Sequence, residues 1–172
     1  LAEVLRAASN ESDDPARAVA HMLEVGELYE TQLADEGSAI SAYESVLAID
    51  PDTGKIKWFY QFTPNDDHDW DSTEDYVLSD MTIGGKQKKV LLHADRNGVY
   101  YVIDRTNGQM LLAKPFVKTN WLSDFDAKGR PLRAAGITPT REGTVVFPGN
   151  QGGTNWYSPS FSPRTGLFYI SA

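Results

Sequence analysis

Apolar residues follow two different spacings along the chain. From residue 14 to residue 47 they recur every three or four positions, which is the period of an amphipathic helix. Asp14-Pro15 is a favourable helix start, because an aspartate at the N-cap is followed by proline at the first helical position. The pattern predicts two helices joined near residues 35–37. The apolar set of the first is Val19, Met22, Leu23, Val25, Gly26 and Tyr29, and that of the second is Ala39, Ile40, Tyr43, Val46 and Leu47.

After Pro51, short apolar runs alternate with turn residues, which is a strand-like pattern. Residues 89–94, 99–103 and 109–112 are three such runs, divided by the turns Asp-Arg-Asn-Gly and Asp-Arg-Thr-Asn-Gly. Asparagine and glycine favour tight turns because they tolerate positive φ. These residues therefore predict a three-stranded antiparallel meander.

One unit of strand, turn and strand is repeated. In residues 48–58 an aspartate, a Thr-Gly pair and Trp58 stand at fixed distances, and residues 102–112 repeat the spacing with Leu112 in place of the tryptophan. Residues 162–170 contain a weaker third copy. Repeated units of this kind are typical of β-propeller blades.

Charge and composition change near the same position. Residues 1–51 carry 11 of the 24 acidic residues but only 2 of the 16 basic ones, whereas residues 52–172 are almost neutral and hold most of the aromatic residues and glycines. We therefore expect two domains, an acidic helical segment over residues 1–51 and a strand-rich domain over residues 52–172. Neither has the basic surplus typical of nucleic-acid binding, so no nucleic-acid partner is expected.

The sequence gives little direct information on cellular location. There is no cysteine, so the redox compartment cannot be inferred. No apolar run approaches the roughly 20 residues that cross a bilayer, and residues 1–10 lack a signal-peptide pattern. We expect no membrane span.

The acidic segment resembles a tetratricopeptide repeat over residues 15–51. Gly26 and Tyr29 fit the small and aromatic positions of the first helix, and Ala39, Tyr43 and Pro51 fit the second helix and its end. The distance from Tyr29 to Ala39 is one residue longer than the repeat prefers, and about three repeats are normally needed for stability. An ordinary helical hairpin without a ligand is the alternative.

The strand-rich domain resembles the quinoprotein alcohol dehydrogenases, which are eight-bladed β-propellers that bind pyrroloquinoline quinone (PQQ). The sequence AIDPDTGKIKW, residues 48–58, is similar to their tryptophan-docking motif, and the likeness continues through residues 59–81, 90–121 and 147–172. The resemblance implies a mainly β fold with two to three blades of a partial propeller, preceded by the α-helical hairpin. Leu112 departs from the motif, so that copy should dock less firmly than Trp58.

The resemblance implies three cofactor-binding residues. Arg96 stands where the family places a cation against the quinone oxygens of PQQ, although a solvated arginine at a hairpin tip is the ordinary expectation. Asn155 and Trp156 match an amide and a ring that line the cofactor pocket in the family. A charge-assisted hydrogen bond from Arg96 would contribute on the order of 1.5–3 kcal/mol.

No catalytic residue and no metal ligand of the family is matched in this chain. In the family a Ca²⁺ or lanthanide ion and an aspartate base assist hydride transfer, and we expect their residues to lie upstream of Ala48. His68, Asp71 and the aspartates between residues 66 and 69 invite a metal-site interpretation, but alternation along a strand would scatter these ligands. His21 and His93 lie in apolar runs, where packed or surface histidines are common.

Two functions remain open at this stage. One is a fragment of a periplasmic PQQ-dependent dehydrogenase that oxidises alcohols or sugars, passes electrons to a cytochrome c-type acceptor, and is inactive as this chain alone. The other is a non-enzymatic interaction module of helices and blades. Residues 46–54 fit both the helical and the propeller pattern, and we expect them to end a helix. An incomplete propeller leaves sheet edges open, which favours self-association.

Overall fold

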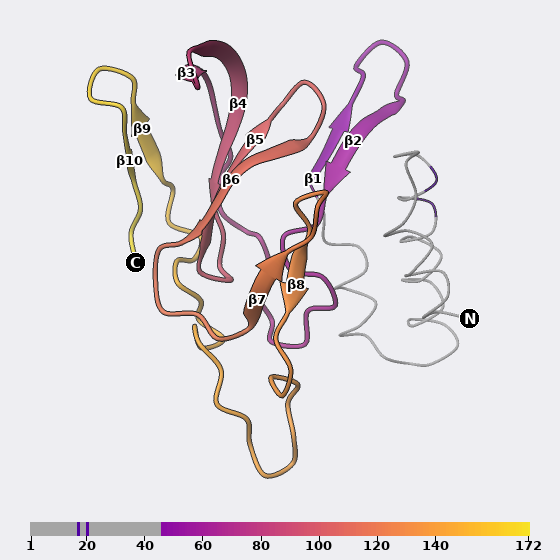
Figure 1. The fold of residues 1–172 in the computed structure, drawn as a ribbon, viewed down its shortest axis with the longest axis vertical. Helices are drawn as coiled ribbons and strands as arrows, with labels where there is room; N and C mark the ends of the chain where they lie inside the picture. The colour runs from indigo at the N-terminus through magenta and orange to yellow at the C-terminus, as the bar shows by residue number, and fades with distance from the viewer. Residues whose placement is uncertain (1–16, 18–19, 21–45) are drawn as a thin grey trace. The chain divides into compact units, whose positions relative to one another are not determined.

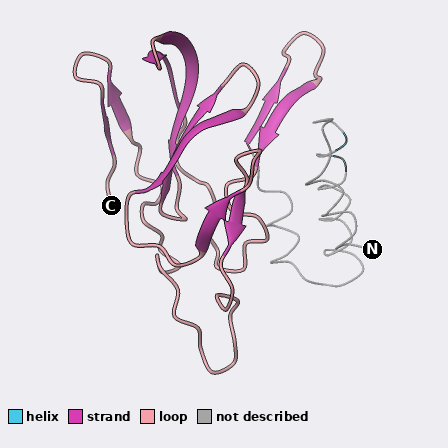
Figure 2. Cartoon of the chain, in the orientation of Figure 1, coloured by secondary structure: helices cyan, strands magenta, loops and turns pink. Residues whose placement is uncertain are grey.

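A computed structural model describes Arg17, Ala20 and residues 46–172. The chain divides into two compact units, Leu1–Asp69 and Trp70–Ala172. Its described part consists almost entirely of strands and loops (Figure 2), so the prediction of a mainly β fold is confirmed. Arg17 and Ala20 are helical, but the rest of the predicted helical hairpin lies outside the described residues.

In the first unit, residues 46–60 form a β-hairpin. Strand β1 (Val46–Ile49) pairs antiparallel with β2 (Ile56–Tyr60), and Ala48 lies opposite Trp58. The prediction that residues 46–54 end a helix is therefore wrong. A strand forms here instead of a helix because β1 has a partner strand within reach across a favourable turn. Helical spacing over so few residues is only a weak preference.

The second unit is built on one four-stranded antiparallel sheet in the order β3-β4-β5-β6 (Figure 1). Its strands are β3 (Val77–Ile83), β4 (Lys86–Ala94), β5 (Val99–Asp104) and β6 (Gln109–Pro115). The last three are the predicted meander, which is confirmed. A four-stranded up-and-down sheet is the form of one propeller blade.

Two short hairpins follow the sheet. The first pairs β7 (Leu122–Phe125) with β8 (Pro131–Arg133), and the second pairs β9 (Ser160–Ser162) with β10 (Leu167–Tyr169). The second corresponds to the weak third copy of the repeat. Each hairpin has only two strands among the described residues, as expected where further blades are incomplete.

The core of the second unit lies over the inner half of the sheet. Along β4 the side chains are largely exposed as far as Lys89 and buried from Val90 to Ala94. Val90, Leu92 and Val102 form a buried cluster on one face, against which Phe161 and Phe168 of the second hairpin pack. Phe168 also contacts Tyr100, with 5.0 Å between ring centroids. The hairpin β9–β10 therefore covers this face as a neighbouring blade would.

The repeated sequence unit is a repeated turn. At the β1–β2 turn the Asp50 carboxylate accepts hydrogen bonds from two backbone N–H groups, and the N–H of Gly54 donates to the Asp50 carbonyl at 2.8 Å. Asp104 and Gly108 make the same backbone bond, also at 2.8 Å. Both glycines have positive φ, 69° and 76°, which explains their place in the motif.

Lys88 fixes the second copy of this turn to the sheet. Its ammonium group lies 2.8 Å from the Asp104 carboxylate, and the hydroxyl of Thr106 donates to the same carboxylate at 2.6 Å. The hydrogen bond from Lys88, followed by that from Thr106, lowers the pKa of Asp104 to about 2. The ionised form is therefore favoured in the folded state.

We expect Asp104→Asn to destabilise the chain by about 1 kcal/mol at neutral pH, since Lys88 is partly exposed and solvent weakens the pair. The stabilisation by Asp104 is present above the unfolded-state pKa near 3.8 and is lost as pH falls through about 2. The difference in urea-unfolding free energy between wild type and variant should thus shrink from pH 5 to pH 2. A difference in unfolding free energy that stays the same from pH 5 to pH 2 would contradict this role of the Asp104 carboxylate.

The two docking positions differ as the sequence suggests. Trp58 is 5% exposed, whereas Leu112, opposite Val102 in the equivalent register, is 40% exposed.

In the part of the chain that the structure describes, no helix has the length and apolar character needed to span a membrane.

Candidate functional site

The candidate site is centred on the turn between β4 and β5. Asp95 opens this turn, and its carboxylate accepts a hydrogen bond from the N–H of Asn97 at 2.9 Å. Gly98, with φ of 87°, closes it. Arg96 at the tip is only 9% exposed. The arginine is therefore held in the structure, unlike an ordinary solvated residue at a hairpin tip.

Arg96 is held by the loop of residues 149–155. Its Nε and Nη2 atoms both donate to the carbonyl of Asn150, at 3.1 and 2.7 Å. Its own carbonyl accepts a hydrogen bond from the N–H of Gly153 at 2.9 Å. The loop and the turn, more than 50 residues apart in sequence, are thus joined through the main chain and side chain of one residue.

The glycines of this loop permit the close approach. A Cβ atom added to Gly152, whose φ is 83°, would overlap Cγ of Arg96 and lie 2.6 Å from the carbonyl oxygen of the same residue. One added to Gly153 would lie 2.6 Å from Cγ2 of Val117. The glycines are therefore required for packing of the loop against the turn.

We expect Gly152→Ala to destabilise the chain by about 2–4 kcal/mol, because positive-φ strain adds to a clash with backbone. Gly136→Ala is the matched control: its φ is 74°, but nothing lies within 4 Å of its added Cβ, so only the strain of about 1 kcal/mol remains. Chemical unfolding of both variants tests this. Equal losses would show that the contact with Arg96 is not tight.

Two buried tryptophans fix the main chain around the site. Trp70 and Trp121 are 1% and 0% exposed, with 5.6 Å between their ring centroids. The indole N–H of Trp70 donates to the carbonyl of Gly149 at 3.0 Å, and that of Trp121 donates to the carbonyl of Asn97 at 2.7 Å. The pair therefore positions the 149–155 loop and the tip of the turn.

Asp71 is a functional candidate that the sequence analysis missed. Its carboxylate lies 3.9 Å from Nη1 of Arg96, and its side chain is 41% exposed. Asp71 follows the buried Trp70, which fixes its place beside the turn. A reachable carboxylate next to a held cation has the features of a general base. The Trp-Asp pair was a possible signal, but the sequence analysis treated it only as part of a metal motif.

A buried acidic cluster lies behind the turn. It consists of Glu74, His93 and Asp95, which are 3%, 0% and 0% exposed and have a ligand-type atom each within 4.8 Å of one another. His93 Nε2 lies 3.0 Å from Asp95 Oδ2, to which the hydroxyl of Ser72 donates at 2.5 Å. Burial, and next the charge of Asp95, raise the pKa of Glu74 to about 7. His93 is thus a packed histidine, as expected.

Asn155 is the last residue of the 149–155 loop, and Trp156 follows it. The Asn155 amide donates to the carbonyl of Gln151 at 3.0 Å and accepts the N–H of Trp156. The Trp156 ring is 70% exposed and lies against Tyr157, with 4.5 Å between centroids. The structure joins Arg96 to the loop that carries Asn155, while the cofactor-binding role of all three residues stays a prediction.

The segment with His68 is a loop, so the argument from strand alternation was wrong. The N–H of His68 donates to the Asp66 carboxylate at 2.8 Å, and its ring lies 3.2 Å from the Asp67 carboxylate. Among the described residues, the groups that could hold a metal ion do not include His68. His21 lies outside the described residues.

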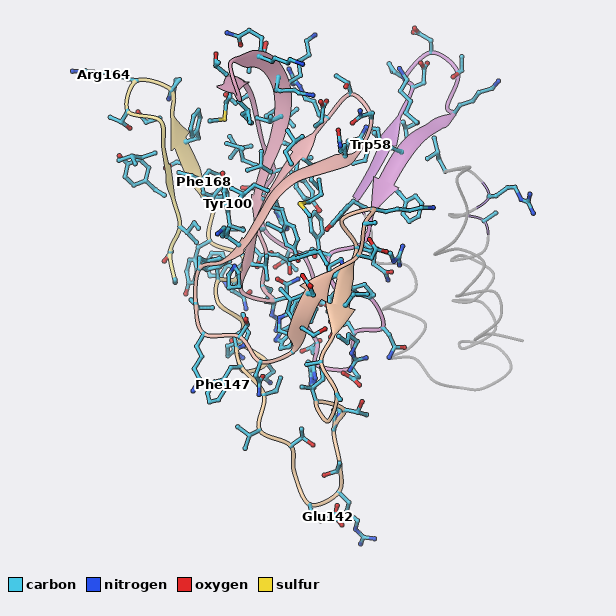
Figure 3. All side chains as sticks on the ribbon, viewed as in Figure 1. Trp58, Tyr100, Glu142, Phe147, Arg164 and Phe168 are labelled. Carbon is cyan, nitrogen blue, oxygen red and sulfur yellow. The ribbon has the colours of Figure 1, made fainter. Side chains whose placement is uncertain are left out.

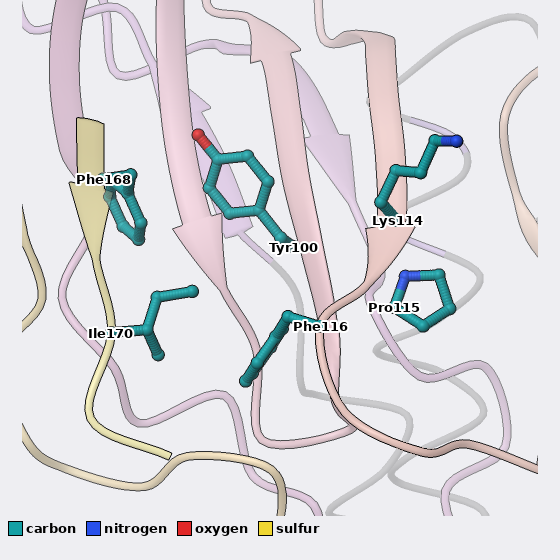
Figure 4. A pocket seen from close by; sticks show the side chains of 6 residues that line it. All are labelled: Tyr100, Lys114, Pro115, Phe116, Phe168 and Ile170. Atoms are coloured by element: carbon teal, nitrogen blue, oxygen red, sulfur yellow. The ribbon is translucent and has the colours of Figure 1, made fainter. Parts of the chain in front are cut away.

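A separate apolar pocket lies between the sheet and the β9–β10 hairpin (Figure 4). It has a volume of about 190 Å³ and contains none of the predicted site residues. Its position at the junction of two sheets indicates imperfect packing between blades rather than a polar cofactor site. It is lined by Tyr100, Lys114, Pro115, Phe116, Phe168 and Ile170.

Part of this chain is similar to known proteins. Residues 36–117 match the model of the PQQ family, described as glucose/ethanol/alcohol dehydrogenase, beta-propeller domain. The quinohemoprotein alcohol dehydrogenase of Comamonas testosteroni is 48% identical over 131 residues, which are 74% of this chain and 18% of that protein. The 1-butanol dehydrogenase (cytochrome c) of Thauera butanivorans is 46% identical over 129 residues, again 74% of this chain and 18% of that protein.

Solved structures agree with these matches. The crystal structure of the Comamonas testosteroni enzyme superposes with a TM-score of 0.66 at 46% identity, covering 74% of this chain and 19% of that one. A europium-containing methanol dehydrogenase superposes with a TM-score of 0.68 at 38% identity, covering 73% and 22%. The resemblance to the propeller of quinoprotein alcohol dehydrogenases is therefore confirmed over the matched residues, and the chain spans about a fifth of the length of these relatives.

Proposed function

We propose that residues 70–172 form part of the wall of a PQQ site in an alcohol dehydrogenase, with Arg96 as the cation that faces the cofactor. The observation that carries this proposal is the fixed position of Arg96, which is 9% exposed and held by the carbonyl of Asn150. A cation that is already fixed in place does not have to be reoriented when negative charge develops on a bound cofactor. Asn155 and Trp156 are proposed to border the same site.

The chemistry of the residues fits the proposed cofactor. PQQ is an anionic quinone, and the turn presents a guanidinium group, which suits planar oxygen acceptors. Arg96 would hold and polarise such oxygens. When bound, PQQ would supply an acceptor for the hydride removed from an alcohol carbon.

We propose Asp71 as the general base of the reaction. It is a partly exposed carboxylate 3.9 Å from the Arg96 guanidinium, so it stands beside the group proposed to face the cofactor. In that role the Asp71 carboxylate would accept the proton of an alcohol hydroxyl. The earlier expectation that the base lies upstream of Ala48 would then apply to the metal ligands alone.

The remaining features belong to the whole protein and are proposals here. By analogy with the relatives, the substrate would be a small alcohol or a sugar, the electron acceptor a cytochrome c, and the location the periplasm. A Ca²⁺ or lanthanide ion would be held by blades outside the described residues. Open edges of the second unit are proposed to favour self-association when other blades are missing.

PQQ titration of the full chain tests the proposed function. We expect quenching of tryptophan fluorescence with saturation at micromolar PQQ in the presence of Ca²⁺, and at least a tenfold loss of affinity in Arg96→Ala, since a charge-assisted bond is worth about 1.5–3 kcal/mol. Arg105→Ala is the control, because Arg105 pairs on the surface with Asp80 at 2.8 Å. Equal affinities for the two variants would contradict the assignment.

A further inference from the structure

The buried cluster behind Arg96 contains one carboxyl group that the proposed function does not use. The Asp95 carboxylate is fully supplied with donors: Ser72 and His93 on Oδ2 and the N–H of Asn97 on Oδ1. Glu74 is as deeply buried, yet neither of its oxygens has a hydrogen-bond partner of good geometry. Two ionised carboxylates this close in a dry interior are strongly disfavoured, so one of them keeps its proton.

The donor set decides which acid is neutral. The Asp95 carboxyl group takes part in three hydrogen bonds, whereas the backbone N–H groups of Glu74 and Arg96 lie near the Glu74 carboxyl group without good geometry. The proton therefore belongs to Glu74. A metal ion fits less well, because Nε2 of His93 and Oδ2 of Asp95 already lie at hydrogen-bond distance from each other.

We propose that Glu74 is a positioning residue for Arg96. The charge state of the buried Glu74 carboxyl group controls how strongly the Arg96 guanidinium attracts an anionic cofactor. The inference rests on the proposed function. A neutral Glu74 adds no negative charge near Arg96, whereas an ionised Glu74 adds one beside Asp95. His93 and Tyr76 are the other titratable groups at the cluster, and their rings lie 4.5 Å apart.

The expected effect has a definite sign. Arg96 lowers the pKa of Glu74, although burial and Asp95 dominate and leave it at about 7. By linkage, ionisation of Glu74 opposes the binding of an anion at Arg96, and binding of the anion favours protonated Glu74. Affinity for PQQ should therefore fall by about tenfold between pH 6 and pH 8, as expected for one added charge at several ångströms in a partly screened interior.

The test is PQQ binding to the full chain at pH 6 and pH 8, for wild type, Glu74→Gln and Glu142→Gln. Glu142 is exposed at the end of a loop (Figure 3) and is the matched control. Wild type and Glu142→Gln should lose about tenfold in affinity at pH 8, whereas Glu74→Gln should bind equally at both values. The same pH dependence in Glu74→Gln would overturn the inference.

Thermal unfolding without PQQ separates the two proposals. Because folding raises the pKa of Glu74, wild type should lose stability relative to Glu74→Gln as pH rises from about 4.5 to about 7. If this pH-dependent loss of stability is observed but wild type binds PQQ at neither pH, the proposed function fails and the binding role of Glu74 fails with it. If PQQ binds and the stability difference between wild type and Glu74→Gln does not change with pH, the inference about Glu74 alone is overturned.

Discussion

Replacing Trp121 by alanine is expected to destabilise the second unit by about 3–5 kcal/mol. The ring is fully buried against Trp70, so truncation leaves a large cavity. It also removes the donor to the carbonyl of Asn97, a residue that is itself 0% exposed and donates to the Tyr101 hydroxyl at 3.2 Å. Since the free energy of unfolding of a domain is only about 5–15 kcal/mol, Trp121→Ala should remove much of the stability of the second unit.

Urea unfolding of the full chain, followed by circular dichroism, measures this loss. Trp156→Ala is a control with the same substitution at a ring that is 70% exposed, and it should cost less than about 0.5 kcal/mol. Trp121→Phe retains most of the packing and removes the hydrogen bond, so an intermediate loss of about 1–3 kcal/mol is expected. Similar losses for Trp121→Ala and Trp156→Ala would contradict the packing described here.

The second large effect concerns catalysis by Asp71. Asp71→Asn removes the proposed base with little change in volume, and we expect kcat to fall by about 10²–10⁴-fold. A chimaera in which residues 70–172 replace the matching segment of the Comamonas testosteroni relative would supply the remaining blades. PQQ affinity should change only a few-fold, because Arg96 is retained.

The control for this prediction is Asp80→Asn in the same chimaera. Asp80 is an exposed aspartate that also pairs with an arginine, Arg105. Its replacement should leave kcat unchanged, since it lies on β3 away from the β4–β5 turn. Asp71 is not the base if Asp71→Asn retains wild-type kcat.

Local turn chemistry made much of the sheet predictable. Asp50 and Asp104 and the glycines four positions later make the same backbone hydrogen bond. The turn at Asp104 was predicted to join two strands of the meander, which is confirmed, whereas residues 46–54 were predicted to end a helix. Strand β3 was less visible, because its burial alternates along a sequence that includes Ser79 and Asp80. The helix predicted to end at residues 46–54 failed because strand pairing with β2, a tertiary contact, overrode a short helical spacing.

The site was only partly predictable for a physical reason. Arg96 could be selected from its motif, but its burial depends on Asn150 and Gly153, which reach it through the folded loop. Asp71 and Glu74 acquire their importance from their distance to that turn, and no local pattern marks this distance. Trp156 was selected by the same motif as Asn155, yet its ring lies exposed on the described surface.

The most direct test of the claim that Arg96 and the 149–155 loop face the cofactor is NMR of the ¹⁵N-labelled full chain titrated with PQQ. The claim predicts saturable shifts at Arg96 Nε, the Gly153 N–H and the Asn155 side-chain amide. Shifts confined to the apolar pocket around Phe116 and Phe168, or no shifts at all, would contradict it.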